Sequence, residues 1–133
     1  MQKTLKRMIS ILLLPSVLYL SGCDLPRWPE KVEGLPNTFR REPLHKNEKV
    51  LSVLVRGDKA PEWLIMAVEP IDVKDFKVQV GRVPEGFEQM FPADNQRFTP
   101  LVGNNYSISI LTDVRNHNCA YVLQMPNSWT AEQ

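Results

Sequence analysis

The sequence predicts an all-β fold: a small antiparallel β-sandwich that follows a cleaved signal peptide and a proline-rich tether. Short apolar or alternating segments recur between residues 49 and 124 at a spacing of about ten residues, and Gly, Pro and Asn turn signals separate them. No strong amphipathic helical pattern occurs outside the first 22 residues. Evenly spaced short strands without helices are typical of a sandwich or a small barrel.

The first 22 residues have the pattern of a secretory signal. Three basic residues precede an apolar run from Met8 to Tyr19, and two small residues precede Cys23. The apolar run contains Pro15 and is shorter than the ~20 residues that a membrane-spanning helix needs. We therefore expect residues 1–22 to be a signal peptide that is removed.

Leu20-Ser21-Gly22-Cys23 resembles the lipobox of bacterial lipoproteins: an aliphatic residue, two small residues and the cysteine to be lipidated. The resemblance implies that the Cys23 thiol receives a diacylglycerol, that the chain is cut before Cys23, and that the new amino group is acylated. The alternative is an ordinary cleaved signal followed by a chance cysteine.

Asp24 directly follows the cysteine. Asp24 resembles the sorting signal of enterobacterial lipoproteins, in which an aspartate at this position blocks export to the outer membrane. This implies a protein anchored in the inner membrane and facing the periplasm. The alternative is that Asp24 is only a polar residue at the headgroup boundary.

Removal of the signal leaves residues 23–133, enough for one domain with a modest hydrophobic core. Of the 16 basic residues three lie in the signal, so 13 remain against 15 acidic residues, a formal charge of −2. Such a near-neutral chain has no electrostatic footprint for nucleic acid and no polybasic patch. We therefore expect the lipid, rather than charge, to provide the membrane attachment.

Residues 23–47 are expected to form the tether. Four prolines are spread through this segment, and proline is excluded from helix interiors and central strands. Two alternatives are open for its aromatic residues. Trp28 lies at the headgroup level of the membrane, or Trp28 and Phe39 fold back on the domain. An edge strand from part of this segment is also open.

Three strands are expected in the first half of the β domain, which we place at residues 48–126. Lys49–Arg56 is β-branched and aliphatic and ends in turn residues. Trp63–Val68 is apolar at every position, which is typical of a strand covered on both faces. Phe76–Val80 alternates, and we expect its apolar side chains to point inward.

Residues 84–104 are less regular. Phe87, Met90 and Phe91 have the i, i+3, i+4 spacing of a short helical turn, which we expect to cap one end of the core. Asp and Asn residues and two prolines interrupt the remainder of this segment.

Two strands are expected near the end, Tyr106–Ile110 and Cys119–Gln124, and residues 127–133 are expected to be a frayed tail. The approach to Tyr106 resembles the corner before strand F of immunoglobulin-like and fibronectin-type domains, in which a tyrosine hydroxyl bonds back to an upstream turn. This implies an immunoglobulin-like or related sandwich. The cysteine and tryptophan landmarks of true immunoglobulin domains are absent.

His117 and Cys119 would share one face of a strand and could serve as a base and a nucleophile or as two metal ligands. A zinc site needs three or four ligands, and the only other histidine, His45, lies in the expected tether. Cys119 has no disulfide partner if Cys23 is lipidated. We therefore expect a turn histidine beside a buried core cysteine.

The acidic residues give no stronger case for catalysis. Asp72 and Asp75 flank Lys74, and Glu85 and Glu88 bracket Phe87, patterns that more often make solvated loops than a catalytic pair. No phosphate-binding glycine loop, nucleophile elbow or HExxH motif occurs in the sequence. We therefore expect no enzymatic activity, no cofactor and no metal.

The expected function is that of a non-enzymatic protein-binding module at the inner membrane. Its expected partners are the membrane through the lipid on Cys23, the lipoprotein processing and sorting machinery, and an unknown periplasmic or inner-membrane protein. The stretch Asp-Leu-Pro-Arg-Trp-Pro at 24–29 resembles small enterobacterial inner-membrane lipoproteins of the YafY/YfjS kind. Two alternatives are open: an immunity protein against a periplasm-acting toxin, and a lipoprotein linked to the envelope stress response.

Overall fold

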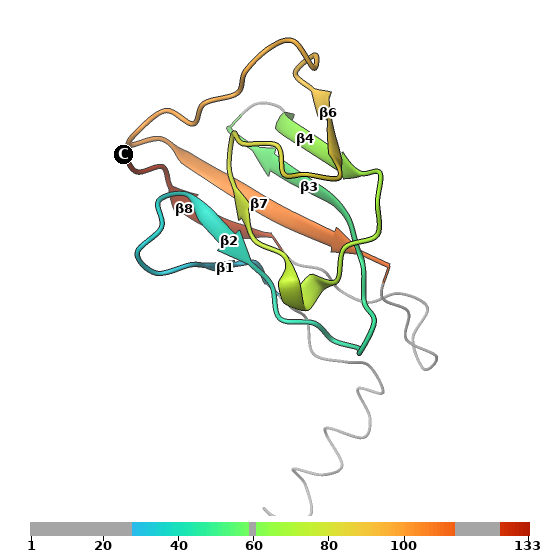
Figure 1. Ribbon diagram of the computed structural model, residues 1–133. Helices are drawn as coiled ribbons and strands as arrows, with labels where there is room; N and C mark the ends of the chain where they lie inside the picture. Colours follow the sequence, from blue (N-terminus) through green and yellow to red (C-terminus); the bar gives the residue numbers. More distant parts are fainter. Residues whose placement is uncertain (1–27, 59–60, 114–125) are drawn as a thin grey trace, which may run out of the picture. The chain divides into compact units, whose positions relative to one another are not determined.

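The computed structural model describes residues 28–58, 61–113 and 126–133 (Figure 1). These residues belong to one of two compact units, Pro26–Val114 with Leu123–Gln133. The expected signal peptide, the lipidation residue Cys23 and the sorting residue Asp24 lie outside the described residues. The expected strand Cys119–Gln124 and the pair His117 and Cys119 lie outside them as well.

Two antiparallel sheets make up the unit, which confirms the predicted all-β sandwich. The smaller sheet has the order β1-β2-β5 and the larger sheet the order β6-β4-β3-β7-β8 (Figure 1). A single 3₁₀ turn, η1 (Val73–Asp75), precedes β5. The strands are β1 (Glu30–Lys31), β2 (Thr38–Arg40), β3 (Val50–Arg56), β4 (Pro61–Ala67), β5 (Val78–Gln79), β6 (Phe87–Phe91), β7 (Asn105–Thr112) and β8 (Asn127–Thr130).

The core lies between the sheets and is built from alternate residues of the strands. As predicted, Phe76, Val78 and Val80 are all buried. Phe39 of the smaller sheet packs edge-on against Trp129 of the larger sheet, with ring centroids 4.8 Å apart. Aromatic pairs of this geometry add to the free energy of area burial, so this contact helps to hold the two sheets together.

The Tyr106 corner is present. The Tyr106 hydroxyl accepts a hydrogen bond of 2.9 Å from the backbone N–H of Leu101, five residues upstream. The order of the strands within each sheet also matches an immunoglobulin variable-type sandwich. In the smaller sheet, β1-β2-β5 take the places of strands A, B and E. In the larger sheet, β6-β4-β3-β7-β8 take the places of strands C″, C′, C, F and G. The connectivity differs, because β5 comes before β6 in the chain, whereas strand E follows C″.

The expected tether boundary at residue 47 is corrected by the structure. Residues 30–31 and 38–40 of that segment form β1 and β2, and Phe39 is fully buried. Pro29, Pro36 and Pro43 all lie outside the paired positions, so none of them removes a ladder hydrogen bond. The folded domain therefore begins close to residue 29, while Trp28 is 48% exposed.

The prediction of a frayed tail at residues 127–133 is wrong. β8 pairs with β7, and Trp129 is only 9% exposed. The Trp129 indole N–H donates to Asn37 Oδ1 at 3.0 Å, and the Asn37 side chain also bonds the backbone N–H and carbonyl of Glu132. Asn37 has a φ of 53°, a left-handed conformation that asparagine tolerates better than most residues. These contacts fix the C-terminal segment against the smaller sheet.

The helical turn expected at Phe87, Met90 and Phe91 is also wrong, because these residues belong to β6, which pairs with β4. Gln89 explains the difference. Its side chain accepts a hydrogen bond of 2.9 Å from the Trp63 indole and donates to the carbonyls of Pro92, Ala93 and Gln96. Gln89 is thus a polar residue at an inward-facing position of β6. The alternation of apolar residues expected for a strand is therefore interrupted in the sequence.

Candidate functional site

The outward side of β4 carries exposed apolar residues. Its sequence is apolar at every position from Trp63 to Val68, which predicted a strand buried on both faces. This prediction is wrong. Trp63 and Ile65 are buried, whereas Met66 is 43% exposed and Val68 is exposed beyond the strand end. Only one face of β4 meets the other sheet, and no described segment forms a third layer over the opposite face. The alternate residues of β4 therefore face away from the core.

Strand register joins these side chains to others in two rows. In the first row, Leu54 of β3 lies opposite Leu64 of β4, which lies opposite Phe91 of β6. In the second row, Ser52 of β3 lies between Met66 of β4 and Leu111 of β7. Directly opposite residues have Cβ atoms about 5 Å apart, so Leu54, Leu64 and Phe91 form a continuous apolar row, whereas Ser52 separates Met66 from Leu111 in the second row. We call Leu54, Leu64, Met66, Phe91 and Leu111 the outer apolar face.

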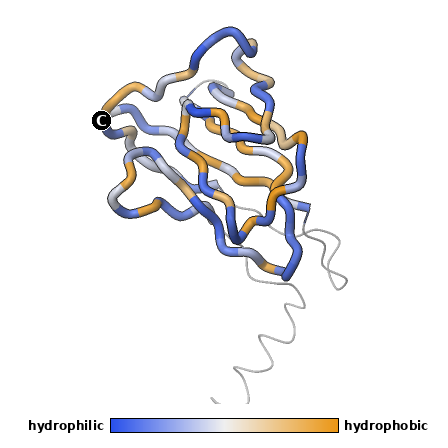
Figure 2. The backbone as a smooth tube through the Cα atoms, in the orientation of Figure 1, coloured by the Kyte–Doolittle hydropathy of each residue, from blue (hydrophilic) through white to orange (hydrophobic). Residues whose placement is uncertain are grey.

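The outer apolar face is exposed enough to make contacts. Phe91 is 50% and Leu111 46% exposed, and Leu54 and Leu64 are half-buried. The hydropathy colouring shows apolar stretches along the strands of the larger sheet and mainly hydrophilic residues in the loops (Figure 2). Several exposed apolar side chains that lie close together on one sheet face are a candidate site of protein or membrane interaction.

The face reaches an edge strand. β6 is the last strand of the larger sheet, and its far side pairs with no described strand. Phe91 and the neighbouring Met90 are both about half exposed there. An edge of this kind can accept an extended segment of another protein as an added strand, with apolar side chains supplying further contacts.

A buried ionic cluster lies at the end of the sandwich where β3 begins and β7 ends. Arg41 and Glu48 form an ion pair with 3.2 Å between Nη2 and Oε2, and both side chains are fully buried. Thr112 Oγ1 donates to Glu48 Oε2 at 2.5 Å and accepts from Arg41 Nη1 at 2.9 Å. Glu48 Oε1 also accepts from the backbone N–H groups of Leu44 and His45. The cluster fixes the loop after β2 against β7.

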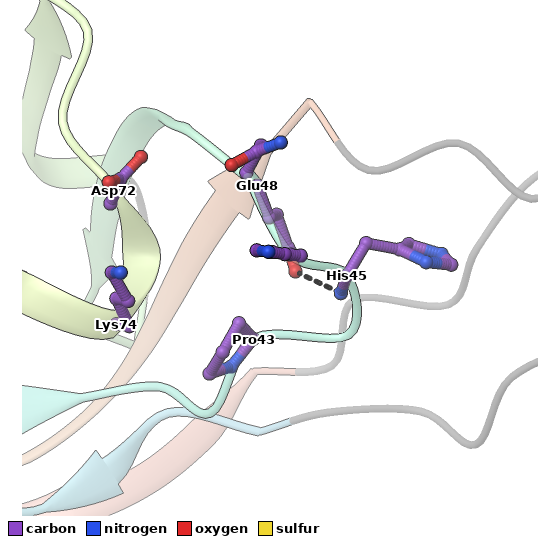
Figure 3. Close-up of a pocket in the computed structure, with 7 residues that line it drawn as sticks. Pro43, His45, Glu48, Asp72 and Lys74 are labelled. Atoms are coloured by element: carbon purple, nitrogen blue, oxygen red, sulfur yellow. Dashed lines mark hydrogen bonds between the residues drawn. The ribbon is translucent and has the colours of Figure 1, made fainter.

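A hollow of about 50 Å³ lies beside this cluster, between the loop after β2 and the segment that carries η1 (Figure 3). Asp72 forms an ion pair with Lys49. The hydrogen bond from Lys49 holds the pKa of the Asp72 carboxyl below its ordinary value, with partial burial opposing the shift. The hollow is much smaller than the ~300 Å³ at which small-molecule sites begin, so it has no room for an ordinary substrate.

The other residues considered for chemistry are dispersed. Asp75 and Lys74 are exposed on η1, and Glu85 and Glu88 are exposed on either side of the buried Phe87. His45 is exposed in the loop after β2. No group of three or more potential metal ligands occurs in residues 28–58, 61–113 and 126–133.

No described helix has the length and apolar character needed to cross a membrane. The chain matches no protein-family model, and no curated protein or solved structure shows significant similarity to it.

The outer apolar face was not predicted from the sequence. The alternation of β7 was a signal for it, because Leu111 is an apolar residue on the outward, otherwise polar side of that strand.

Proposed function

We propose that the protein is a lipoprotein anchored through Cys23 in the inner membrane, facing the periplasm, and that it binds another protein through the outer apolar face. The exposure of this face carries the proposal. Phenylalanine and methionine are enriched at protein interfaces, and the position of the face beside an edge strand allows side-chain and main-chain contacts together.

The distance to the anchor supports a partner at the membrane. Residues 24–28 separate Cys23 from the start of the folded domain. Even fully extended, this connection spans at most about 18 Å. A domain held so close to the lipid meets proteins embedded in the same membrane, or proteins that approach its surface, before it meets others.

The anchor also lowers the affinity that the face must supply. Three acyl chains on Cys23 would hold the protein stably, because each buried CH₂ contributes about 0.8 kcal/mol and two lipid signals already suffice. Confinement to one membrane raises the effective concentration of a membrane-bound partner. A small apolar face can then be sufficient for recognition. Binding of this kind involves no chemical step and no cofactor.

The test is crosslinking in cells of the full-length lipidated protein, followed by purification and mass spectrometry. We expect one dominant partner. Met66→Lys should remove it, because the substitution places a charge in the centre of the outer apolar face. The introduced ammonium group would lie opposite Glu88, so the strand pairing itself should tolerate the change.

Two controls make the result specific. Val102→Lys changes an exposed apolar residue of the loop before β7 by the same charge, outside the face, and should keep the partner. Cys23→Ala should weaken capture by removing the anchor. Recovery of the same partner from Met66→Lys, with folding unchanged, would contradict the proposed face. Recovery of none from the unmodified protein would contradict the proposed function.

A further inference from the structure

The described part of the chain enters the sandwich at one end. Glu30 of β1 lies opposite Arg40 of β2, and Lys31 lies opposite Phe39. Pro29, which directly precedes β1, therefore lies at the end at which β2 finishes. The loop after β2, with Arg41 and Glu48, lies at this same end, as does η1 (Figure 1).

Most acidic groups at this end already have a cationic or backbone partner. Glu42 pairs with Arg40, Glu48 with Arg41, and Asp72 with Lys49. The Asp113 carboxylate accepts a hydrogen bond from the backbone N–H of Lys49.

Two lysines line the hollow without an ion pair to any described residue, Lys46 in the loop after β2 and Lys74 on η1. Lys74 lies close enough to Asp72 to help lower its pKa, but Asp72 forms its ion pair with Lys49. Lys46 and Lys74 thus border the hollow, while the two carboxylates that line it, Glu48 and Asp72, pair with Arg41 and Lys49. Figure 3 shows Lys74 and Asp72 facing the loop of Pro43 and Glu48 across it.

We propose that this hollow binds the phosphate group of an anionic phospholipid, with Lys46 and Lys74 as the two cationic contacts. The inference rests on the lipid anchor of the proposed function. A volume of about 50 Å³ admits part of a headgroup but no larger ligand. Asp75 and Asp113 are exposed at the same end, so the excess of positive charge is confined to the hollow. This favours one bound headgroup over adsorption of the whole end.

Headgroup binding would set the orientation of the domain. With this end on the bilayer, the long strands of the larger sheet run away from the membrane. The outer apolar face then lies roughly perpendicular to the membrane plane. In that orientation the face is open to a neighbouring membrane protein rather than covered by lipid.

The experiment is lysine footprinting of the full lipidated protein. The protein is reconstituted into vesicles of phosphatidylcholine alone or with phosphatidylglycerol, and acetylation of each lysine by an amine-reactive reagent is measured by mass spectrometry. We expect phosphatidylglycerol to slow labelling of Lys46 and Lys74 about fivefold, the factor that corresponds to about 1 kcal/mol per lysine at an anionic surface. Lys31, which pairs with Glu132 away from this end, should label equally in both vesicles.

Variants test the site itself. Lys46→Gln should restore fast labelling of Lys74, because half of the phosphate contacts are lost. The double variant Arg82→Gln/Arg97→Gln removes two exposed charges that line a different hollow, and it should leave the protection of Lys46 and Lys74 intact. Loss of protection in that double variant would mean general attraction to the surface and would overturn the site.

The remaining outcomes separate the two proposals. If the protein floats with both vesicles but Lys46 and Lys74 label equally, headgroup binding is refuted and the anchor stands. Protection by inorganic phosphate in phosphatidylcholine vesicles would indicate a soluble phosphate ligand and would overturn the lipid assignment. Failure to float with either vesicle would refute the anchor and, with it, both proposals.

Discussion

Glu48→Gln tests how much the buried ionic cluster stabilises the domain. Glutamine keeps the volume of the side chain and an oxygen for the N–H groups of Leu44 and His45, but it removes the negative charge. The Arg41 guanidinium then remains buried and loses its ion pair with the Glu48 carboxylate. Breaking a buried pair in this way costs about 3–5 kcal/mol. That is a large part of the ~5–15 kcal/mol by which a domain is typically stable.

Urea unfolding measures this loss. The buried indoles of Trp63 and Trp129 provide a fluorescence signal for unfolding. With a slope of about 2 kcal/mol/M, typical for a small domain, the midpoint should fall by about 2 M urea with the slope unchanged. The matched control is Glu42→Gln, which breaks the exposed pair with Arg40 and should shift stability by no more than about 1 kcal/mol.

A double variant identifies the cause. Arg41→Met/Glu48→Gln removes both charges, so part of the lost stability should return, because no arginine charge is then buried beside a neutral glutamine. Equal midpoints for Glu48→Gln and Glu42→Gln would refute the reasoning. A double variant less stable than Glu48→Gln by the full cost of losing Arg41 would show that the arginine acts through other contacts.

Three further predictions use the same titration. Tyr106→Phe should lower the free energy of unfolding by about 1 kcal/mol, because the Leu101 N–H loses its acceptor; no change would deny the corner a stabilising role. Trp129→Ala should cost about 3–5 kcal/mol, whereas a frayed tail would tolerate it. The pKa of Asp72 is lowered in the folded protein by Lys49, so the stability from this pair is present above about pH 4 and is lost as the pH falls through the lowered value. In Asp72→Asn, the free energy of unfolding should therefore fall less steeply with pH below about pH 4, and its dependence on pH near neutrality should be unchanged. The same steepness below about pH 4 as in the unmodified protein would contradict the pairing.

The strands with a clear period in the sequence were predicted correctly. β3 and β7 follow β-branched and alternating runs, and the inward set of Phe76, Val78 and Val80 is confirmed. Each of these segments buries one of its faces in the core, and burial of one face produces the hydrophobic periodicity that the sequence shows.

The misassigned segments share a different cause. β1, β2 and β8 are two to four residues long, too short for a period to be visible. Their order depends on long-range contacts, such as the bonds of the Asn37 side chain to Trp129 and Glu132, more than 90 positions away. A proline-rich composition favours an extended tether only when no such contacts exist, and sequence alone does not reveal them. The outer apolar face was hidden for a related reason, because an unbroken apolar strand looks the same whether one or both faces are covered.

The correction of the tether changes how an anchored domain would work. A flexible connection of 25 residues would allow the domain to turn freely, and no surface would be favoured over another. With the fold beginning near residue 29, five residues separate Cys23 from it, and Pro29 lies at the end of the sandwich that holds Lys46 and Lys74. A short connection to one end restricts which surfaces can meet the bilayer. In a protein anchored as proposed, it would leave the side of the larger sheet, and with it the outer apolar face, open to proteins in the same membrane. If Cys23 carries the proposed lipid, the short connection, the lysine-lined hollow and the apolar sheet face would act together, and the position of the anchor would determine which partner the face can reach.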